Sequence, residues 1–154
     1  MKIREIRERT PEQVQALLQV WEASVRATHS FLTEAEILRI RAYVPQAIGG
    51  VEHLITAETE QGKAAGFMGV ENGRLEMLFL LPDERGKGLG KQLVELGIRA
   101  YGVREVTVNE QNPQAVGFYT HIGFEPYRRT DCDEEGGPYP LLYMKLKEWQ
   151  KGHF

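Results

Sequence analysis

The sequence contains a single cysteine, Cys132, among its 154 residues. One thiol cannot form an intramolecular disulfide, and zinc sites built from paired cysteines are excluded with it. The four histidines are scattered without the spacing that metal ligands need, so we predict no metal cofactor. Because no secretory signal is recognised in the first residues, we expect the protein to work in a reducing cytoplasm.

Long apolar segments and an excess of positive charge are also missing. The longest unbroken apolar run, residues 77–81, is far shorter than the roughly 20 residues that cross a membrane as a helix. Lys and Arg number 19 against 22 Asp and Glu, which gives a net charge of −3. A nucleic-acid backbone is bound mainly through a cationic surface. We therefore expect neither a membrane nor a nucleic acid as partner.

The length of the chain fits one folded domain. A chain of about 150 residues buries roughly 68–70% of its unfolded surface, so its core needs no disulfide or metal. The sequence shows no internal repeat and no linker. We therefore predict a single domain over residues 1–147, followed by a short C-terminal tail over residues 148–154.

Apolar periodicity and turn signals predict an order of strands and helices that is typical of an α+β fold. Thr10–Gln13 has the residues of a helix capping box, and Thr33–Glu36 repeats the pattern before a second helical stretch that ends ahead of Pro45. Asn72-Gly73 is a strong signal for a tight hairpin turn. The expected strands cover residues 1–9, 53–58, 63–70, 74–81, 103–108, 124–128 and 141–146, and the expected helices cover residues 11 to about 28, 34–44, 88–101 and 113–122.

Two of these helices carry an apolar stripe that we assign to the core. Residues spaced three and four apart lie on one face of a helix, and such a face is usually buried. The stripe of the first helix is Val14, Leu17, Leu18, Trp21 and Val25, and that of the helix over residues 88–101 is Leu89, Leu93, Leu96 and Ala100.

A glycine-rich segment, Arg85–Gly90, stands between an apolar strand and a helix. A helix N-terminus has free N–H groups and a positive partial charge, so glycines there predict a site for a phosphorylated ligand. A nucleoside-triphosphate loop fits poorly, because the spacing from Gly86 to Gly90-Lys91 is one residue short and Gln92 replaces the magnesium-binding hydroxyl. A dinucleotide fingerprint fails as well, since the glycines follow a G-x-G-x-G pattern. A glycine turn without a ligand is the remaining alternative.

The residues around this segment resemble a known family. Leu78–Gly90 is similar to the acetyl-CoA motif, [RQ]-x-x-G-x-[GA], of the GCN5-related N-acetyltransferase (GNAT) superfamily. Further along, Asn112–Tyr119 and the following Gly123-Phe124 resemble the second motif of that family, N-x-x-A-x-x-F-Y and G-F. The two motifs occur in the family's order and on the expected elements, so the chain resembles a small bacterial-type, single-domain GNAT protein.

The resemblance implies the GNAT fold, a central mixed and mostly antiparallel sheet flanked by helices. Two parallel strands, here residues 77–81 and 103–108, would splay apart like a V. It also implies acetyl-CoA as the acetyl donor, with the pantetheine arm along the first of these strands and the pyrophosphate at the glycine segment. The implied cofactor-binding residues are Leu78, Phe79, Leu80, Arg85, Gly86, Lys87, Gly88, Leu89, Gly90, Lys91 and Asn112.

Acetyl transfer to an amine requires a base for the amine, stabilisation of the oxyanion and a proton for the leaving thiolate. Tyr119 matches the family's tyrosine proton donor. Its unperturbed pKa near 10 is above the value of about 8.5 for a thiol, so donation is uphill unless the site lowers the pKa or the transfer is concerted. The base is open between Glu76, where the family places a glutamate, and His29, between two helices that cover the acceptor side in this fold. Strand alternation places Glu76 on one face with Leu78 and Leu80.

The resemblance implies an N-acetyltransferase that works by direct attack in a ternary complex, because Cys132 lies away from both motifs and cannot carry a covalent acetyl group. The acceptor is open between a small-molecule amine and an amine of a peptide or protein. We expect a monomer or a homodimer. A non-catalytic acyl-CoA-binding sensor or regulatory module is the alternative, which Tyr119 disfavours. The acidic loop residues that could attract a cationic acceptor are Asp131, Asp133, Glu134 and Glu135.

Overall fold

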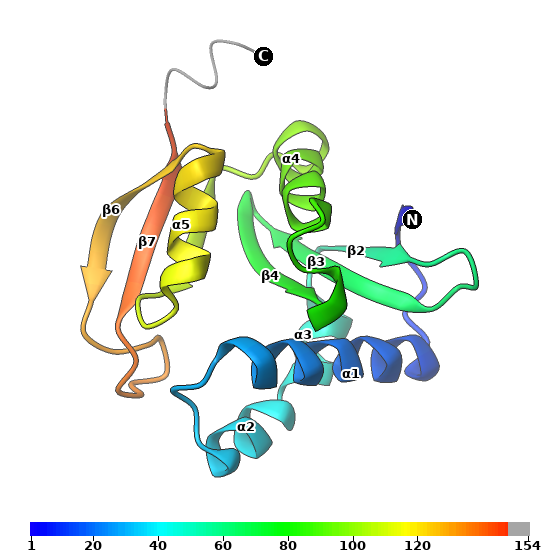
Figure 1. The fold of residues 1–154 in the computed structure, drawn as a ribbon, viewed down its shortest axis with the longest axis horizontal. Helices are drawn as coiled ribbons and strands as arrows, with labels where there is room; N and C mark the ends of the chain where they lie inside the picture. The colour runs from blue at the N-terminus through cyan, green and yellow to red at the C-terminus, as the bar shows by residue number, and fades with distance from the viewer. Residues whose placement is uncertain (148–154) are drawn as a thin grey trace. The chain divides into compact units, whose positions relative to one another are not determined.

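The computed structural model in Figure 1 describes residues 1–147 and divides into two compact units, one from Met1 to Val103 and one that begins at Arg104. The predicted tail, residues 148–154, lies outside the described residues. The prediction of one domain over residues 1–147 stays a prediction. No helix within residues 1–147 combines the length and the apolar character that a membrane span needs.

The first unit contains an antiparallel sheet and the helices that cover it. Its elements are β1 (Lys2–Glu5), α1 (Pro11–Thr28), α2 (Glu34–Arg41), α3 (Val44–Gly50), β2 (His53–Glu58), β3 (Ala64–Glu71), β4 (Arg74–Leu80), the 3-10 helix η1 (Pro82–Glu84) and α4 (Leu89–Tyr101). The strands lie in the order β1-β2-β3-β4, and each neighbouring pair is antiparallel.

The second unit contains β5 (Glu105–Asn109), α5 (Pro113–Ile122), β6 (Phe124–Thr130) and β7 (Leu141–Leu146). Strand β7 pairs with both β5 and β6, and both pairs are antiparallel. The α+β class and the predicted succession of strands and helices are therefore confirmed. The V-shaped splay between residues 77–81 and 103–108 stays a prediction.

Local signals account for most element boundaries. Thr10 accepts a hydrogen bond from the Gln13 N–H, and the Gln13 side chain accepts one from the Thr10 N–H, so the capping box at the start of α1 is complete. Thr33 accepts from the N–H three residues later at the start of α2. Asn72 (φ 54°) and Gly73 (φ 78°) both adopt the left-handed backbone that a two-residue turn between β3 and β4 requires.

Helix α3 departs from the prediction. Pro45 is a stop signal for the preceding helix, which ends at Arg41, but a proline also fits the first turn of a new helix, where its missing N–H has no partner to lose. Val44 and Ile48 of α3 are buried. Tertiary packing therefore stabilises a short helix that the sequence alone does not predict.

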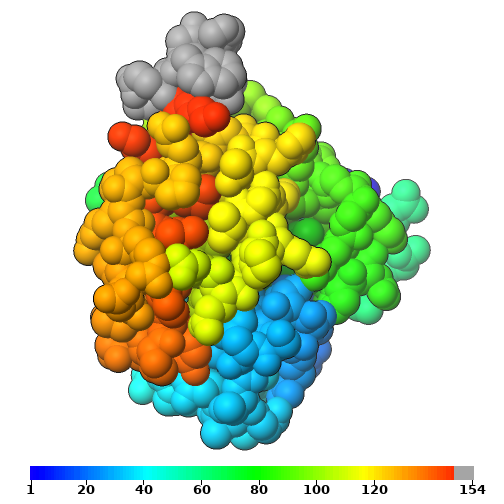
Figure 2. Space-filling model, turned by 60° about the vertical axis from the view of Figure 1, so that its left-hand side comes forward, coloured from blue at the N-terminus to red at the C-terminus, as the bar shows by residue number. Residues whose placement is uncertain are grey.

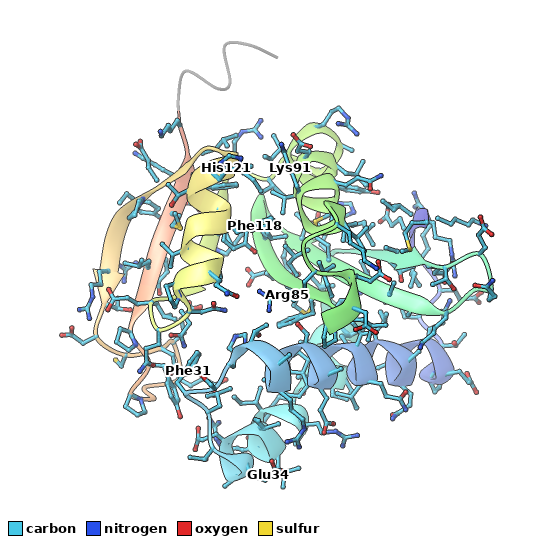
Figure 3. The ribbon with its side chains drawn as sticks, in the orientation of Figure 1. Phe31, Glu34, Arg85, Lys91, Phe118 and His121 are labelled. Carbon is cyan, nitrogen blue, oxygen red and sulfur yellow. The ribbon has the colours of Figure 1, made fainter. Side chains whose placement is uncertain are left out.

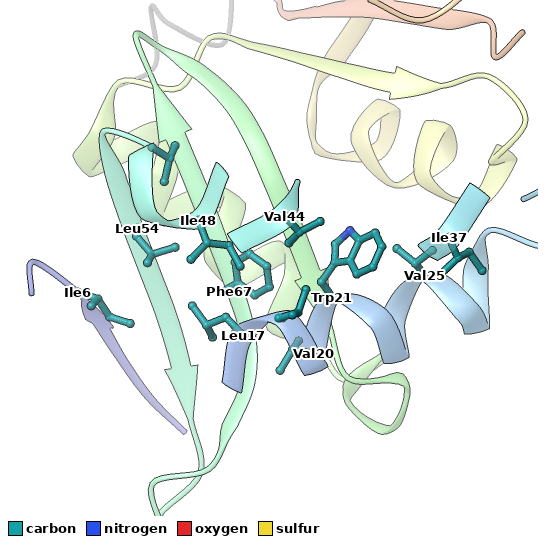
Figure 4. Packing of buried hydrophobic residues seen from close by; sticks show 12 residues of the cluster. Ile6, Leu17, Val20, Trp21, Val25, Ile37, Val44, Ile48, Leu54 and Phe67 are labelled. Atoms are coloured by element: carbon teal, nitrogen blue, oxygen red, sulfur yellow. The ribbon is translucent and has the colours of Figure 1, made fainter. Parts of the chain in front are cut away.

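One apolar cluster holds α1 and α3 against the sheet (Figure 4). Leu17, Trp21 and Val25 of α1 are buried in it together with Ile48 of α3 and Phe67 of β3, so the stripe predicted for the first helix is confirmed. Side chains from β4 and the position after it also pack on this cluster, which shows which face of β4 points toward α1. These residues are Met77, Phe79 and Leu81.

Helix α4 packs on the opposite face of the sheet. Met68 is next to Phe67 in β3, so its side chain points away from α1 and toward Gly97 of α4. Leu89 and Leu93 are buried as predicted and Leu96 is half-buried, whereas Ala100 is exposed, so the predicted stripe is wrong at Ala100. Glycines let a helix backbone approach its neighbour closely. The buried face of α4 is therefore the face that contains its glycines. The residues that α4 buries are Leu89, Gly90, Leu93, Val94 and Gly97.

In the second unit, α5 packs against β5 and β6. The buried residue of this helix is Tyr119, whose ring meets the ring of Phe124 edge-on with the centroids 5.9 Å apart. Strand β6 lies at the edge of its sheet and exposes residues 125–129, and Figure 2 shows the surface of α5 in yellow and that of β6 in orange. The aromatic residues of the second motif therefore form the packing contact between helix and strand.

Gly97→Val is expected to lower the free energy of unfolding by about 1–3 kcal/mol, because its Cβ would lie 3.0 Å from a methyl group of Val103 and 3.3 Å from the sulfur of Met68. Gly117→Val is the matched control. Gly117 is also inside a helix, but a Cβ there meets no atom within 4 Å, so the change should stay within about 0.5 kcal/mol. Chemical denaturation followed by circular dichroism measures both. Equal effects would contradict the close approach of α4 to β3.

Candidate active site

The turn after β4 enters α4 through two glycines in the left-handed conformation. Gly86 has a φ of 78° and Gly88 a φ of 87°, and such values cost a residue with a Cβ roughly 1–2 kcal/mol. A Cβ at either position would meet no atom within 4 Å. Both positions therefore favour glycine for backbone reasons and leave open space beside the backbone for a ligand.

Helix α4 begins without a side-chain cap. Gly88 is the N-cap residue, and the Gln92 N–H donates to the Gly88 carbonyl at 3.0 Å. The N–H groups of residues 89–91, in the first turn, have no carbonyl acceptor within the helix. This turn contains no acidic residue, and Lys87 and Lys91 are both exposed. Figure 3 labels Lys91 on this helix. The helix dipole and the lysines thus both favour a bound anion, which fits the predicted pyrophosphate site.

Glu76 lies at an irregularity in β4. Gly69 of β3 pairs with Met77, but the next residue, Val70, pairs with Leu75, so Glu76 is the extra residue of a β-bulge. The bulge interrupts the predicted alternation between Glu76 and the residues after Met77, so the face assigned to Glu76 stays a prediction. The Glu76 side chain is exposed. A bulge re-aims the side chain of its extra residue, so the strand period cannot give the direction of this carboxylate.

The stretch predicted to run beside the pantetheine arm is held on one edge by β3. Leu78 pairs with Met68, Phe79 with Phe67 and Leu80 with Gly66. The rings of Phe79 and Phe67 pack with centroids 5.6 Å apart, so this side chain belongs to the core. The role predicted for these residues uses their backbone groups, which the core packing leaves unaffected.

His29 is the C-cap residue of α1 and is half-buried. Its Nδ1 lies 2.7 Å from Thr28 Oγ1, and its ring packs at a tilt on Phe31 with the centroids 5.2 Å apart. Burial lowers the pKa of the imidazole below its usual value of 6.5, and the positive charge of Arg85 lowers it further. At neutral pH the imidazole is therefore mostly uncharged, which is the form a general base needs.

Tyr119 is buried in α5, and within residues 1–147 its hydroxyl makes no hydrogen bond. Burial raises the pKa of this phenol above its usual value of 10. The phenol is therefore fully protonated at physiological pH. The gap to a thiol of pKa about 8.5 is wider than for a free tyrosine, so donation from Tyr119 needs a transfer that is concerted with departure of the sulfur.

Two other predicted residues have tasks in the local structure of the second unit. The Asn112 Oδ1 accepts a hydrogen bond from the Ala115 N–H at 3.2 Å and so caps α5. In the acidic loop, Asp131 pairs with Arg129 at 2.5 Å, and the Asp133 Oδ1 accepts two backbone N–H groups of the loop at 3.0 and 2.7 Å. These contacts offset part of the loop's negative charge, which weakens its case as the acceptor site.

The first unit places His29 within electrostatic reach of Arg85, because α1 packs against η1 and Arg85 follows η1 directly. Glu76 belongs to the same unit, whereas Tyr119 and Asn112 belong to the second. A meeting of all these groups around one substrate stays a prediction. Among residues 1–147, no three histidine, cysteine or acidic side chains are grouped so that they could hold a metal ion.

Comparison with protein families identifies the group to which the chain belongs. Residues 10–146 match the family model described as an acetyltransferase (GNAT) domain. The chain belongs to the GNAT family. Two relatives are named peptidyl-lysine N-acetyltransferase YjaB. The protein from Salmonella typhimurium is 39% identical over 139 residues, which cover 90% of this chain and 95% of the relative. The protein from Escherichia coli is 40% identical over 144 residues, which cover 90% and 94%.

A solved structure supports the same assignment. The solution structure of the apo form of YjaB from Escherichia coli has a TM-score of 0.82 and 36% identity to this chain. The match covers 94% of this chain and 96% of the YjaB chain. The GNAT fold expected from the sequence is therefore confirmed. Acetyl-CoA-dependent N-acetyl transfer is the activity of this GNAT protein.

Sequence reasoning missed two features of this GNAT site. One is the bulge at Glu76, which depends on the register between two strands and has no local signal. The other is Thr28, whose hydroxyl contacts the candidate base. A threonine at the last position of a helix commonly bonds to the carbonyl four residues earlier, but that pattern does not reveal where the next side chain lies.

Arg85→Gln should raise the pKa of His29, because the guanidinium charge is one of the two causes that lower it. Burial is the larger cause and remains, so the pKa should stay below its usual value. Lys87→Gln is the matched control, since it removes a cation from the same turn that is not among these causes. Titration of the His29 ring signals by NMR measures both. An unchanged pKa in Arg85→Gln, or an equal rise in Lys87→Gln, would rule out the interaction.

Proposed function

We propose that this GNAT protein transfers the acetyl group of acetyl-CoA to the ε-amino group of a lysine in a peptide or protein. The observation that carries the proposal is the identity of 39% and 40%, over 90% of the chain, to two proteins named peptidyl-lysine N-acetyltransferase. A small-molecule amine is the competing acceptor. The single exposed thiol, Cys132, supports a reducing compartment, so the cytoplasm is the expected location.

The glycine turn is the proposed pyrophosphate site. Open space beside Gly86 and Gly88, the uncapped start of α4 and the two lysines of this turn support the assignment. The N–H groups of residues 86–91 would bind the phosphate oxygens, and Lys87 and Lys91 would add charge. Residues 78–80 would bind the pantetheine arm through their backbone. Acetyl-CoA supplies the acetyl group as a thioester, which an amine can attack without a metal.

The remaining residues handle protons in this proposal. The base, His29 or Glu76, removes one proton from the lysine ammonium so that the nitrogen has a lone pair for attack. Tyr119 donates its phenolic proton to the departing sulfur. Its raised pKa keeps the proton on the phenol, so the transfer to sulfur is concerted with cleavage of the carbon–sulfur bond. Direct attack in a ternary complex needs no covalent acetyl group on the protein.

The acceptor is tested by measuring thiol release from acetyl-CoA in the presence of defined amines. One set contains peptides that have an internal lysine and a blocked N-terminus, and the same peptides with the lysine ε-amino group already acetylated are its control. A second set contains polyamines and free amino acids. Turnover with the unmodified lysine peptides alone supports the proposal. Turnover with the small amines alone would replace the peptide acceptor with a small-molecule one.

Gly88→Asn should weaken acetyl-CoA binding about tenfold or more, because its side chain would occupy the space that phosphate needs and displace hydrogen bonds worth about 1.5–3 kcal/mol. Asparagine tolerates the left-handed backbone, so the fold should survive. Gly62→Asn is the matched control. Gly62 has a φ of 82° and equally open surroundings, but it lies in the turn between β2 and β3. Calorimetric titration measures both, and equal affinities would remove the pyrophosphate assignment.

Tyr119→Phe should lower kcat about 10²- to 10⁴-fold, the range typical of a lost general acid. Acetyl-CoA affinity and stability should change little, because the hydroxyl has no hydrogen bond within residues 1–147 to lose. Tyr127→Phe is the control, since it deletes a hydroxyl that donates to Glu105 at 2.6 Å in the same unit. Near-normal turnover of Tyr119→Phe on a verified acceptor, with chemistry rate-limiting, would refute the role of proton donor.

A further inference from the structure

The hydroxyl of Thr28 contacts both a backbone carbonyl and the ring of His29, and these two contacts bear on which ring nitrogen has the proton. Thr28 Oγ1 lies 2.9 Å from the Ser24 carbonyl oxygen and 2.7 Å from His29 Nδ1. Both distances are those of hydrogen bonds. A hydroxyl has one proton, so it can donate to only one of these neighbours.

Only one of the two arrangements satisfies both contacts. If the Thr28 hydroxyl donated to His29 Nδ1, its oxygen would face the Ser24 carbonyl oxygen at 2.9 Å with no proton between them. If the hydroxyl donates to Ser24, its oxygen lone pair is free to accept from an N–H at Nδ1 of His29. The neutral imidazole then has its proton on Nδ1 and an unprotonated Nε2.

We propose that Thr28 is a positioning residue that holds neutral His29 in the Nδ1–H form and so presents Nε2 as the base for the acceptor lysine. The inference rests on the proposed function and chooses between the two candidate bases. In the step, the Nε2 lone pair takes one proton from the lysine ammonium, which becomes a neutral amine. His29 becomes an imidazolium that keeps its Nδ1–H bond to Thr28, so proton transfer requires no rearrangement of the ring.

The surroundings of His29 suit this role. Its N–H donates to the Val25 carbonyl at 2.8 Å, which fixes the backbone, and the Phe31 ring packs on the imidazole. Within residues 1–147, Arg85 is the charged group that lowers the pKa of the imidazole, and together with burial it keeps the ring neutral between turnovers. In a helix, a threonine has few χ1 rotamers and is anchored by its bond to the carbonyl four residues earlier, so the hydroxyl position is set before any substrate binds.

Nitrogen-15 NMR tests the tautomer without any need for catalysis. At a pH where His29 is neutral, the unmodified protein should show a protonated Nδ1 and an unprotonated Nε2. Thr28→Val keeps the branched shape but removes the acceptor, so the proton should move to Nε2. Thr28→Ser keeps a hydroxyl and should keep the original tautomer. A proton on Nε2 in the unmodified protein, or the same tautomer in all three proteins, overturns the proposal.

Kinetics with an unmodified lysine peptide as the acceptor test the consequence for the reaction. Thr28→Val should lower kcat/KM roughly three- to tenfold, the size of one lost hydrogen bond, and change the acidic limb of the pH profile, whereas Thr28→Ser should restore both. In a His29→Asn background, Thr28→Val should have no further effect, because Thr28 acts through His29. An undiminished further loss there, or an acidic limb that disappears in Glu76→Gln but not in His29→Asn, overturns the role of His29.

Failure of the proposed acceptor has a different signature. If no lysine peptide is acetylated while the tautomer and its response to Thr28→Val are as expected, the acceptor is wrong and the positioning of His29 by Thr28 stands. The kinetic comparison is then made with the amine that is acetylated. If lysine peptides are acetylated normally but the expected tautomer is absent, the acceptor is right. Thr28 and His29 are then removed from the mechanism.

Discussion

The left-handed backbone at Gly86 and Gly88 is the constraint on which the candidate site depends. It turns the chain from the end of β4 into α4, so that the first turn of this helix presents free N–H groups and no side-chain cap. Gly97 then allows α4 to lie close to Met68 of the sheet, which holds the helix in place. A residue with a Cβ at either turn position would add strain where the ligand needs an accessible backbone.

Helix α1 supplies the second part of the arrangement through its apolar stripe. Val25 is buried, and His29 follows four residues later, on the same helical face but beyond the last turn. The imidazole is therefore directed toward the interior, while the end of the helix leaves it half-exposed. The packing of α1 against η1 brings it into the field of Arg85. The position of the candidate base is thus a consequence of core packing.

The sequence predicts most of this fold because its signals are local. The capping box at Thr10, the Asn72-Gly73 turn and the glycine segment each determine a backbone conformation within a few residues. The failures have non-local causes. Helix α3 forms because its apolar residues are buried. Ala100 is exposed because the position of Gly97 against β3 decides which face of α4 is buried. The bulge at Glu76 depends on the register between two strands. The motifs predicted the family and the candidate residues, but one-dimensional spacing contains no information on which hydroxyl contacts His29.

The two candidate proton-transfer groups are shifted in opposite directions, and both shifts favour the neutral form. Burial lowers the pKa of His29 and raises that of Tyr119, so an unprotonated imidazole and a protonated phenol coexist over a wider pH range than the free side chains allow. A lysine acceptor, with an ordinary pKa of about 10.4, is still mostly an ammonium in the part of this range that lies below that value. On the proposed mechanism, the dependence of rate on pH above neutrality therefore reflects the acceptor amine, and the protein's own groups set only the acidic limit.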